Sequence, residues 1–242
     1  MEILFEDNDV LLINKPAGLM VHSDGRNTEP TLVDWILEQY PSIAGIGEPL
    51  RRGDTAIDRP GIVHRLDRET SGALLLAKNQ DSFLFFKSQF QNRTIQKKYH
   101  AFVWGHINNS PVTIDVPIGR NKGDFRKWHA GRGVRGETRE AITILQTLHN
   151  FVDEQGEQFS FIEAHPKTGR THQIRVHLKY IQRPIVCDSL YNESKPAALG
   201  FTRLALHAYQ ITFTLSSGEQ KTVTAPYEPD FKATIAKYVP AC

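Results

Sequence analysis

A charged nine-residue segment between two short apolar runs is the feature that most constrains this chain. The segment runs from His64 to Gly72; Gly61–Val63 precedes it and Ala73–Ala77 follows it. Short continuous apolar runs of this kind are typical of strands that are buried on both faces. We therefore expect the polar segment to be a loop that the core fixes at both ends, with Asp67 near its middle.

Asp67 stands between two arginines, Arg65 and Arg68. Nearby positive charge favours the ionised form of a carboxyl group, and an ionised carboxylate can act as a nucleophile or stabilise a developing positive charge. A surface turn with a local salt bridge explains the same residues, because structural ion pairs also surround carboxylates with charge. The charge pattern alone leaves both interpretations open.

The segment from His64 to Gly72 resembles the signature of the RluA-type pseudouridine synthases, a family of enzymes that isomerise uridine in RNA. Two further stretches, Lys97–Ala101 and Lys167–His177, follow in the family's order, and the resemblance covers nearly the whole chain. It implies that Asp67 is the catalytic residue and that Tyr99 lies beside the target base. It also implies that Arg175 pairs with the catalytic carboxylate.

The same resemblance suggests further contacts to RNA. Arg65 is a candidate to fill the space that a flipped-out base vacates, and Arg170 to position RNA or the loop. Leu206 matches the family's apolar residue against the base, although a plain core leucine fits as well. The remaining candidates within the three motifs are Arg68, Lys97 and His172.

The most basic part of the chain is the segment 119–139, in which seven Lys and Arg residues alternate with aromatic side chains and glycines. Basic groups bind the RNA backbone, and aromatic rings can stack on unpaired bases. A solvated flexible hairpin fits these residues equally well. The family has a related arginine-rich hairpin here, which favours RNA contact through Arg120, Arg126 and Lys127.

The third motif predicts a helix capped by Thr171. In that helix Ile174, His177 and Leu178 fall on a core face, and His172, Arg175 and Lys179 fall on a polar face. Several histidines so close together could suggest a metal site. No acidic ligand is nearby and no His pair has the spacing of a zinc protease, so we expect no metal.

Apolar periodicity and end signals predict the other elements. Helices are expected over Thr31–Tyr40, Asn79–Asn92 and Pro229–Tyr238, the first with Thr31 and Asp34 as a capping pair. Strands are expected at Ile3–Phe5, Val10–Ile13, Ile95–Trp104, Thr138–Leu148 and Gln158–Ala164. Residues 41–60 are predicted to be a loop, and Lys15 fits either a phosphate contact or a solvated turn lysine.

Composition limits the protein class. The chain is 40% hydrophobic and 23% charged, which is usual for a globular protein, and its formal net charge is only +2. A basic surface for RNA must therefore be local.

The cysteines, Cys187 and Cys242, have neither disulfide-framework nor metal-site spacing, which indicates a reducing compartment. We expect a cytoplasmic monomer that binds RNA, has no signal peptide or membrane span, and needs no cofactor.

Recurring hairpin turns and an excess of strands predict an α+β fold with an antiparallel sheet. The resemblance implies one catalytic domain over residues 1–242, with a mixed, mostly antiparallel sheet, flanking helices and a central RNA-binding cleft. It implies no separate N-terminal S4 module.

The implied activity is an isomerase that converts specific uridines in ribosomal or transfer RNA stem-loops to pseudouridine, using an Asp nucleophile and base flipping. The sequence leaves open whether Asp67 attacks the sugar, attacks the base or removes a sugar proton. Two rivals remain: a non-catalytic RNA-binding protein on the same fold, and a carboxylate-based glycosidase or nucleosidase. The second would need another acid near Asp67, for which Glu69 is the close candidate.

Overall fold

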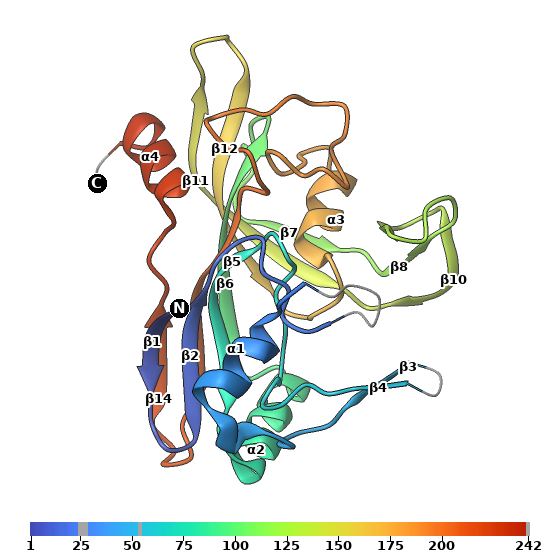
Figure 1. Ribbon diagram of the computed structural model, residues 1–242. Coiled ribbons are helices and arrows are strands. Elements are labelled where there is room, and N and C mark those ends of the chain that lie inside the picture. Colours follow the sequence, from blue (N-terminus) through green and yellow to red (C-terminus); the bar gives the residue numbers. More distant parts are fainter. Residues whose placement is uncertain (24–28, 53–54, 241–242) are drawn as a thin grey trace. The chain divides into compact units, whose positions relative to one another are not determined.

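The computed structural model describes residues 1–23, 29–52 and 55–240, and the chain divides into two compact units. Unit 1 comprises Met1–Gln96 and Ala208–Pro226, and unit 2 comprises Lys97–His207 and Tyr227–Cys242. Both units combine helices with antiparallel strands, which confirms the predicted α+β class (Figure 1). Among the described residues, no helix is long and apolar enough to cross a bilayer.

Unit 1 is built on strands that carry the chain's most apolar runs. β2 (Val10–Lys15) pairs antiparallel with β1 (Glu2–Glu6) on one side and with β5 (Ser71–Ala77) on the other. All seven residues of β5 are buried, as expected for an apolar run that is covered on both faces. β13 (Leu206–Thr214), which belongs to unit 1 from Ala208 onward, pairs with β14 (Gln220–Thr224), and β14 lies beside β1 (Figure 1).

Two helices of unit 1 begin at the caps that the sequence predicts. α1 (Leu32–Gln39) follows Thr31, whose N–H and hydroxyl donate to the Asp34 carboxylate over 2.6 and 2.8 Å. α2 (Gln80–Gln91) follows Asn79, whose side-chain oxygen accepts the Ser82 N–H at 2.8 Å. Such bonds satisfy backbone donors that the first turn of a helix leaves open. α2 packs against β5 (Figure 1).

Two predictions for unit 1 are wrong. The expected loop at 41–60 contains a 3₁₀ turn, η1 (Pro41–Ile43), and a small hairpin of β3 (Leu50–Arg52) and β4 (Thr55–Ile57). Strands of three residues are too short to show an apolar period. The run Gly61–Val63 is not a strand either, because only Ile62 forms a bridge, to Leu76 of β5.

The strands of unit 2 form an antiparallel series. β6 (Gln96–Trp104) pairs with β12 (Gln158–Pro166), β12 with β11 (Ile142–Val152), and β11 with β7 (Val112–Asp115). The turn between β11 and β12 lies at Asp153–Gly156, where the Gly156 N–H donates to the Asp153 carbonyl at 3.1 Å.

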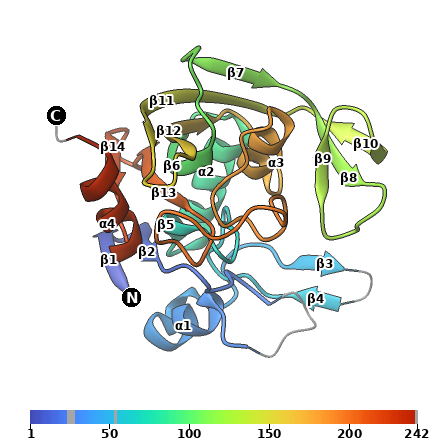
Figure 2. The same cartoon turned by 90° about the horizontal axis from the view of Figure 1, so that it is seen from above.

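A separate three-stranded sheet contains most of the basic segment. β8 (Ile118–Asn121) is its middle strand and pairs with β9 (Trp128–Ala130) and β10 (Val134–Arg139). β9 packs against α3 (Gln173–Tyr180) (Figure 2). The prediction of a single strand over Thr138–Leu148 is therefore wrong. The start of this range belongs to β10 and the remainder to β11.

The helix α4 spans Pro229–Tyr238, as predicted. Its Phe231 is fully buried and lies 5.5 Å from the Phe102 ring of β6 and 5.1 Å from the Phe201 ring. Aromatic rings at such distances add favourable pair contacts to the burial of their surface. α4 therefore closes one side of the hydrophobic core of unit 2.

Gly72, the last residue of the charged segment, has a backbone angle φ of +109° and no room for a side chain. A Cβ atom there would collide with the backbone of Ala208 in β13. We expect Gly72→Ala to lower the free energy of unfolding by about 2–3 kcal/mol, because it adds a backbone clash to an unfavourable φ. Urea denaturation measures this change.

Gly218 provides the matched control, because it also has a positive φ, +88°, but nothing lies within 4 Å of the position of its Cβ. Gly218→Ala should cost only about 1 kcal/mol, the penalty of the backbone conformation alone. Equal losses for the two variants would show that the close approach of Ala208 is unimportant.

Candidate active site

The charged segment of unit 1 is a loop held at both ends by backbone contacts. The imidazole Nε2 of His64 accepts the N–H of Leu75 in β5 at 2.9 Å, and its ring stacks on Phe90 at 4.5 Å. Further along, the Thr70 N–H donates to the Asp67 carbonyl at 3.1 Å. These contacts position Asp67, which is half-buried, within a loop that has little freedom to move.

Lys15 anchors the same loop from the end of β2. It is fully buried, and its ammonium donates to the carbonyls of Pro16, Leu19 and Arg68 over 2.7, 2.9 and 3.1 Å. The Gly18 N–H bonds to the Arg68 carbonyl as well, at 2.9 Å. Both interpretations of Lys15 from the sequence are therefore wrong: it is neither an exposed phosphate contact nor a solvated lysine, but a charged group that fixes backbone.

The two arginines next to Asp67 bind other groups. Arg68 pairs with Glu29 at 2.8 Å and donates to the Gly18 carbonyl at 3.0 Å. The Arg65 guanidinium lies 3.3 Å from the Nε2 atom of His22. Each arginine therefore has a contact other than the Asp67 carboxylate. Both arginines are exposed.

In unit 2, the second motif lies on β6. Tyr99 is half-buried, stands opposite Ala164 of β12 and packs against the hydrophobic core. Burial lowers the pKa of Lys97, two residues earlier on the strand, to about 8. Its ammonium lies 3.9 Å from the position of a Cβ at Gly169, a residue of the third motif. The second and third motifs thus meet within unit 2.

Arg175, in α3, forms a buried ion pair. Its Nε and one terminal nitrogen donate to the two carboxylate oxygens of Asp188 over 2.8 and 2.7 Å, and the side chains are 10% and 1% exposed. The guanidinium also lies over the Tyr191 ring, 5.1 Å from its centre. The predicted polar helix face is therefore wrong at this position, because Arg175 points into the protein.

Asp188 and Tyr191 contact residues of the third motif, and the sequence reasoning missed both. The Asp188 carboxylate also accepts the N–H groups of Leu190 and Tyr191, at 3.1 and 3.0 Å. The Tyr191 hydroxyl bonds to His172 Nδ1 and to the Trp128 N–H of β9, at 2.9 Å each. Asp188 follows Arg175 by 13 residues, beyond the end of α3, so helical spacing does not reveal the pair.

The start of α3 is organised by Gln173 rather than by Thr171. His172 is the N-cap, with a φ of +56°, and the Thr171 cap is therefore wrong. The buried Gln173 side chain accepts the Arg170 N–H at 3.0 Å and donates to the Ile142 carbonyl at 3.0 Å. The Arg170 guanidinium donates to the Glu140 carbonyl at 2.9 Å, which ties the third motif to the end of the basic segment.

His177, on the same helix, has a structural role. It is fully buried between the Thr143 hydroxyl and the Val116 carbonyl, each 2.9 Å from a ring nitrogen. Burial lowers the pKa of this imidazole, which favours the neutral ring. Its two bonds join α3 to β11 and to the connection between β7 and β8. Leu206 is only 3% exposed and belongs to the hydrophobic core of unit 2, as expected for a core leucine.

The basic segment presents its charges in different ways. Arg120 is exposed, and its guanidinium lies 4.3 Å from the centre of the Trp128 ring. The exposed Arg126 pairs with Asp124 over 2.8 Å, whereas the half-buried Lys127 pairs with Glu193 over 2.8 Å. All three predicted contacts therefore lie on the surface of the β8–β9–β10 sheet or its turns.

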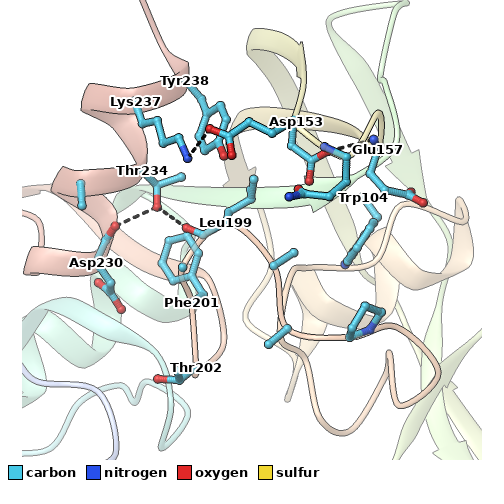
Figure 3. A pocket seen from close by; sticks show the side chains of 17 residues that line it. Trp104, Asp153, Glu157, Leu199, Phe201, Thr202, Asp230, Thr234, Lys237 and Tyr238 are labelled. Atoms are coloured by element: carbon cyan, nitrogen blue, oxygen red, sulfur yellow. Dashed lines mark hydrogen bonds and ion pairs between the residues drawn. The ribbon is translucent and has the colours of Figure 1, made fainter.

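Unit 2 also contains a hollow of about 700 Å³, whose lining differs from the predicted catalytic residues. The β11–β12 turn, with Asp153 and Glu157, lines one side, and α4, with Thr234 and Lys237, lines another (Figure 3). Asp230 and Glu154 add two further carboxylates. Because like charges repel, this acidic lining is unsuited to RNA phosphates, and Tyr99 and Arg175 are not part of it.

Asp67 belongs to unit 1, and Tyr99 and Arg175 belong to unit 2. Each unit therefore contributes one part of the predicted catalytic set, held by its own contacts. A common site of the three side chains, and the cleft that would contain it, stay predictions.

Comparison with known proteins identifies the family. Residues 9–180 match the family model described as RNA pseudouridylate synthase. An uncharacterized RNA pseudouridine synthase of Bacillus subtilis (strain 168), YlyB, is 37% identical over 97% of this chain and 72% of its own. The ribosomal large subunit pseudouridine synthase D of Borreliella burgdorferi is 33% identical over 98% of this chain and 68% of its own.

Solved structures agree with the sequence relatives. The human RNA pseudouridylate synthase domain containing 1 superposes with a TM-score of 0.74 at 27% identity, over 99% of this chain and 88% of that chain. The human RNA pseudouridylate synthase domain containing 4 gives a TM-score of 0.73 at 25% identity, over 98% and 92%. The chain therefore belongs to the RNA pseudouridylate synthase family, whose members are isomerases acting on RNA.

Proposed function

We propose that this enzyme isomerises specific uridines in structured RNA and that Asp67 is its nucleophile. The observation that carries the proposal is the fixation of the Asp67 loop by Lys15, His64 and Gly72. Burying a lysine whose ammonium donates only to backbone carbonyls carries a large desolvation cost. Such an arrangement is favoured where one side chain in the loop must be held in a defined orientation.

The chemistry requires a carboxylate of this kind. Pseudouridine formation breaks the N1–C1′ bond, turns the uracil and joins C5 to C1′; the C5 proton leaves and N1 gains a proton. Atoms balance without an oxidant or another reactant. The sugar carbon becomes electron-poor during the exchange, and a carboxylate can stabilise or attack such a carbon, as in glycoside chemistry.

The base must leave the RNA stack to reach the half-buried Asp67 carboxylate. We assign the exposed Arg65 to the space that the base vacates and Tyr99 to stacking on the uracil, where its hydroxyl could accept the C5 proton. Arg175 would hold the Asp67 carboxylate. A guanidinium carries five N–H donors, so the bidentate bond to Asp188 does not exhaust it, and Asp188 would fix its orientation.

We propose that the remaining predicted contacts bind the RNA outside the reacting base. Four of these residues lie within the motifs: Arg68, Lys97, Arg170 and His172. The other three belong to β8 or to the turn between β8 and β9: Arg120, Arg126 and Lys127. Leu206 would contribute an apolar wall below the base. The charges on the hairpin of β8 and β9 would pair with phosphates. Such pairing is the usual source of salt-dependent RNA affinity.

Two relatives are named ribosomal large subunit pseudouridine synthase D, which favours ribosomal RNA stem-loops over transfer RNA as the substrate. We propose that the enzyme acts as a cytoplasmic monomer. The free thiol of Cys187, whose pKa is raised by burial, is in line with a reducing compartment; Cys242 lies outside the described residues.

Removing charge from the hairpin should change the salt dependence of binding. For the double variant Arg120→Ala/Arg126→Ala, we expect weaker RNA binding and a salt slope that is shallower by about one to two phosphate contacts. Lys232→Ala, on an exposed part of α4, is the control and should leave the slope unchanged. Titrations at several salt concentrations give the slopes, and identical slopes for all proteins would show that the hairpin does not bind phosphates.

The proposed activity is tested with RNA labelled with tritium at C5 of uridine and isolated from a strain that lacks this protein. The purified enzyme should release tritium and form an equal amount of pseudouridine. Release of free uracil would indicate a nucleosidase, and binding without tritium release would indicate a non-catalytic RNA-binding protein. Either result would refute the proposed function.

A further inference from the structure

The tip between β8 and β9 presents one aromatic side chain to solvent. Phe125 is 76% exposed, more than any other large hydrophobic residue in the described chain. The eight residues 120–127 contain four basic residues and one acidic residue around it. An aromatic ring stabilises a fold mainly when it is buried. The exposed position of Phe125 therefore contributes little to the stability of the protein.

The turn that carries Phe125 is held by several internal hydrogen bonds. The Asn121 side-chain oxygen accepts the N–H groups of Gly123 and Asp124, at 2.7 and 3.0 Å. The Lys127 N–H donates to the Asp124 carbonyl at 3.0 Å, and the Asp124 carboxylate binds both the backbone and the guanidinium of Arg126. The exposed ring is therefore not the result of a loose loop.

Arg120 fixes the position of Phe125 itself. Its guanidinium donates to the Phe125 carbonyl at 3.0 Å while lying over the Trp128 ring. The Arg126 guanidinium holds the pKa of Asp124 at about 2, so the acid that organises the turn stays charged under all ordinary conditions. Two cations thus lie directly next to the backbone that displays the ring.

The other aromatic residues of the hairpin are already engaged. The half-buried Trp128 has one face covered by Arg120, and its backbone N–H bonds to the Tyr191 hydroxyl. The His129 ring lies against Gly133, 3.4 Å from the position of a Cβ there. Trp128 and His129 therefore pack against other residues of the protein, whereas the Phe125 ring is presented to solvent.

We propose that Phe125 stacks on an unpaired nucleobase of the RNA substrate, while the neighbouring cations hold the adjoining phosphates. Base stacking on an aromatic ring is tolerant of base identity but needs a base that is not paired. The inference rests on the proposed function and narrows its substrate to RNA with a loop or bulge within reach of the hairpin.

The test compares binding of three fluorescently labelled probes: a single-stranded oligouridylate, an RNA duplex, and an abasic oligoribonucleotide that keeps only ribose and phosphate. Phe125→Ala should weaken binding of the oligouridylate by about 5- to 150-fold, and should leave the duplex and the abasic probe unchanged. Phe125→Trp should restore the affinity, and Phe125→Leu should restore little of it, because only the first keeps an aromatic face.

Phe85→Ala is the matched control, because it truncates an exposed phenylalanine in α2, outside the hairpin. It should bind all three probes like the wild type. Because Phe125 is so exposed, its variants should also melt at the wild-type temperature, so a loss of affinity cannot be attributed to unfolding.

Two outcomes would overturn the inference. Unchanged binding of oligouridylate by Phe125→Ala, or an equal loss for all three probes, would show that the ring does not stack on bases. If the wild type still releases tritium from labelled RNA, the proposed function survives that failure. If the wild type releases none, the proposed function fails and the inference fails with it.

Discussion

Replacing Asp67 by asparagine is expected to lower the single-turnover rate of pseudouridine formation by at least about a thousandfold. The substitution keeps the size and shape of the side chain but removes the negative charge that a nucleophile needs. Affinity for the RNA should stay unchanged, because the substitution leaves in place the contacts of Lys15 and His64 with the backbone that hold the loop.

Glu69 offers a matched control in the same loop. It is a carboxylate two residues away, and it lies 3.7 Å from Arg68 with a side chain that is 42% exposed. Glu69→Gln should keep the wild-type rate if Asp67 is the single catalytic acid. If both variants lose the rate equally, two acids cooperate as in a glycosidase, and the assignment of Asp67 as sole nucleophile is wrong.

Truncation of Arg175 is expected to have two separable effects. Arg175→Ala leaves the Asp188 carboxylate buried without its partner, so the free energy of unfolding should fall by about 3–5 kcal/mol. At a temperature where the variant is folded, its rate with saturating RNA should fall by at least about a hundredfold, with little change in affinity. Urea denaturation and single-turnover assays measure the two effects.

Arg203→Ala is the control that distinguishes a structural role of Arg175 from a catalytic one. Arg203 forms another Arg–Asp pair in unit 2, to Asp230 at 2.7 Å, with a side chain that is 12% exposed. Arg203→Ala should destabilise the protein and leave the rate of the folded enzyme unchanged. If Arg175→Ala does no more than that, or if it changes only a salt-dependent affinity, Arg175 does not act on the catalytic carboxylate.

Local signals in the sequence predicted local structure well. The Thr31–Asp34 pair and Asn79 mark the starts of two helices, and Pro229–Tyr238 is the last one. These elements depend on contacts within a few residues, which a sequence displays directly. The apolar run Ala73–Ala77 also lies in a strand, because a continuous apolar run indicates burial from the sequence itself.

The environment of the charged residues was not predictable in the same way. Lys15 is buried because three carbonyls, one of them 53 residues away, converge on its ammonium. Arg175 points inward because Asp188 comes from a segment beyond the end of its helix. Helical spacing gives only the face on which a residue lies, whereas its partner is set by the tertiary fold.

The central claim is that Asp67 performs uridine isomerisation in a defined RNA. It is tested most directly by mapping pseudouridines in the RNAs of a strain whose own copy of this protein carries Asp67→Asn, with the variant present at the wild-type level. We predict that a small set of pseudouridines is missing, the same set that is missing when the protein is absent, and that all others remain. A map identical to that of the wild type would contradict the account.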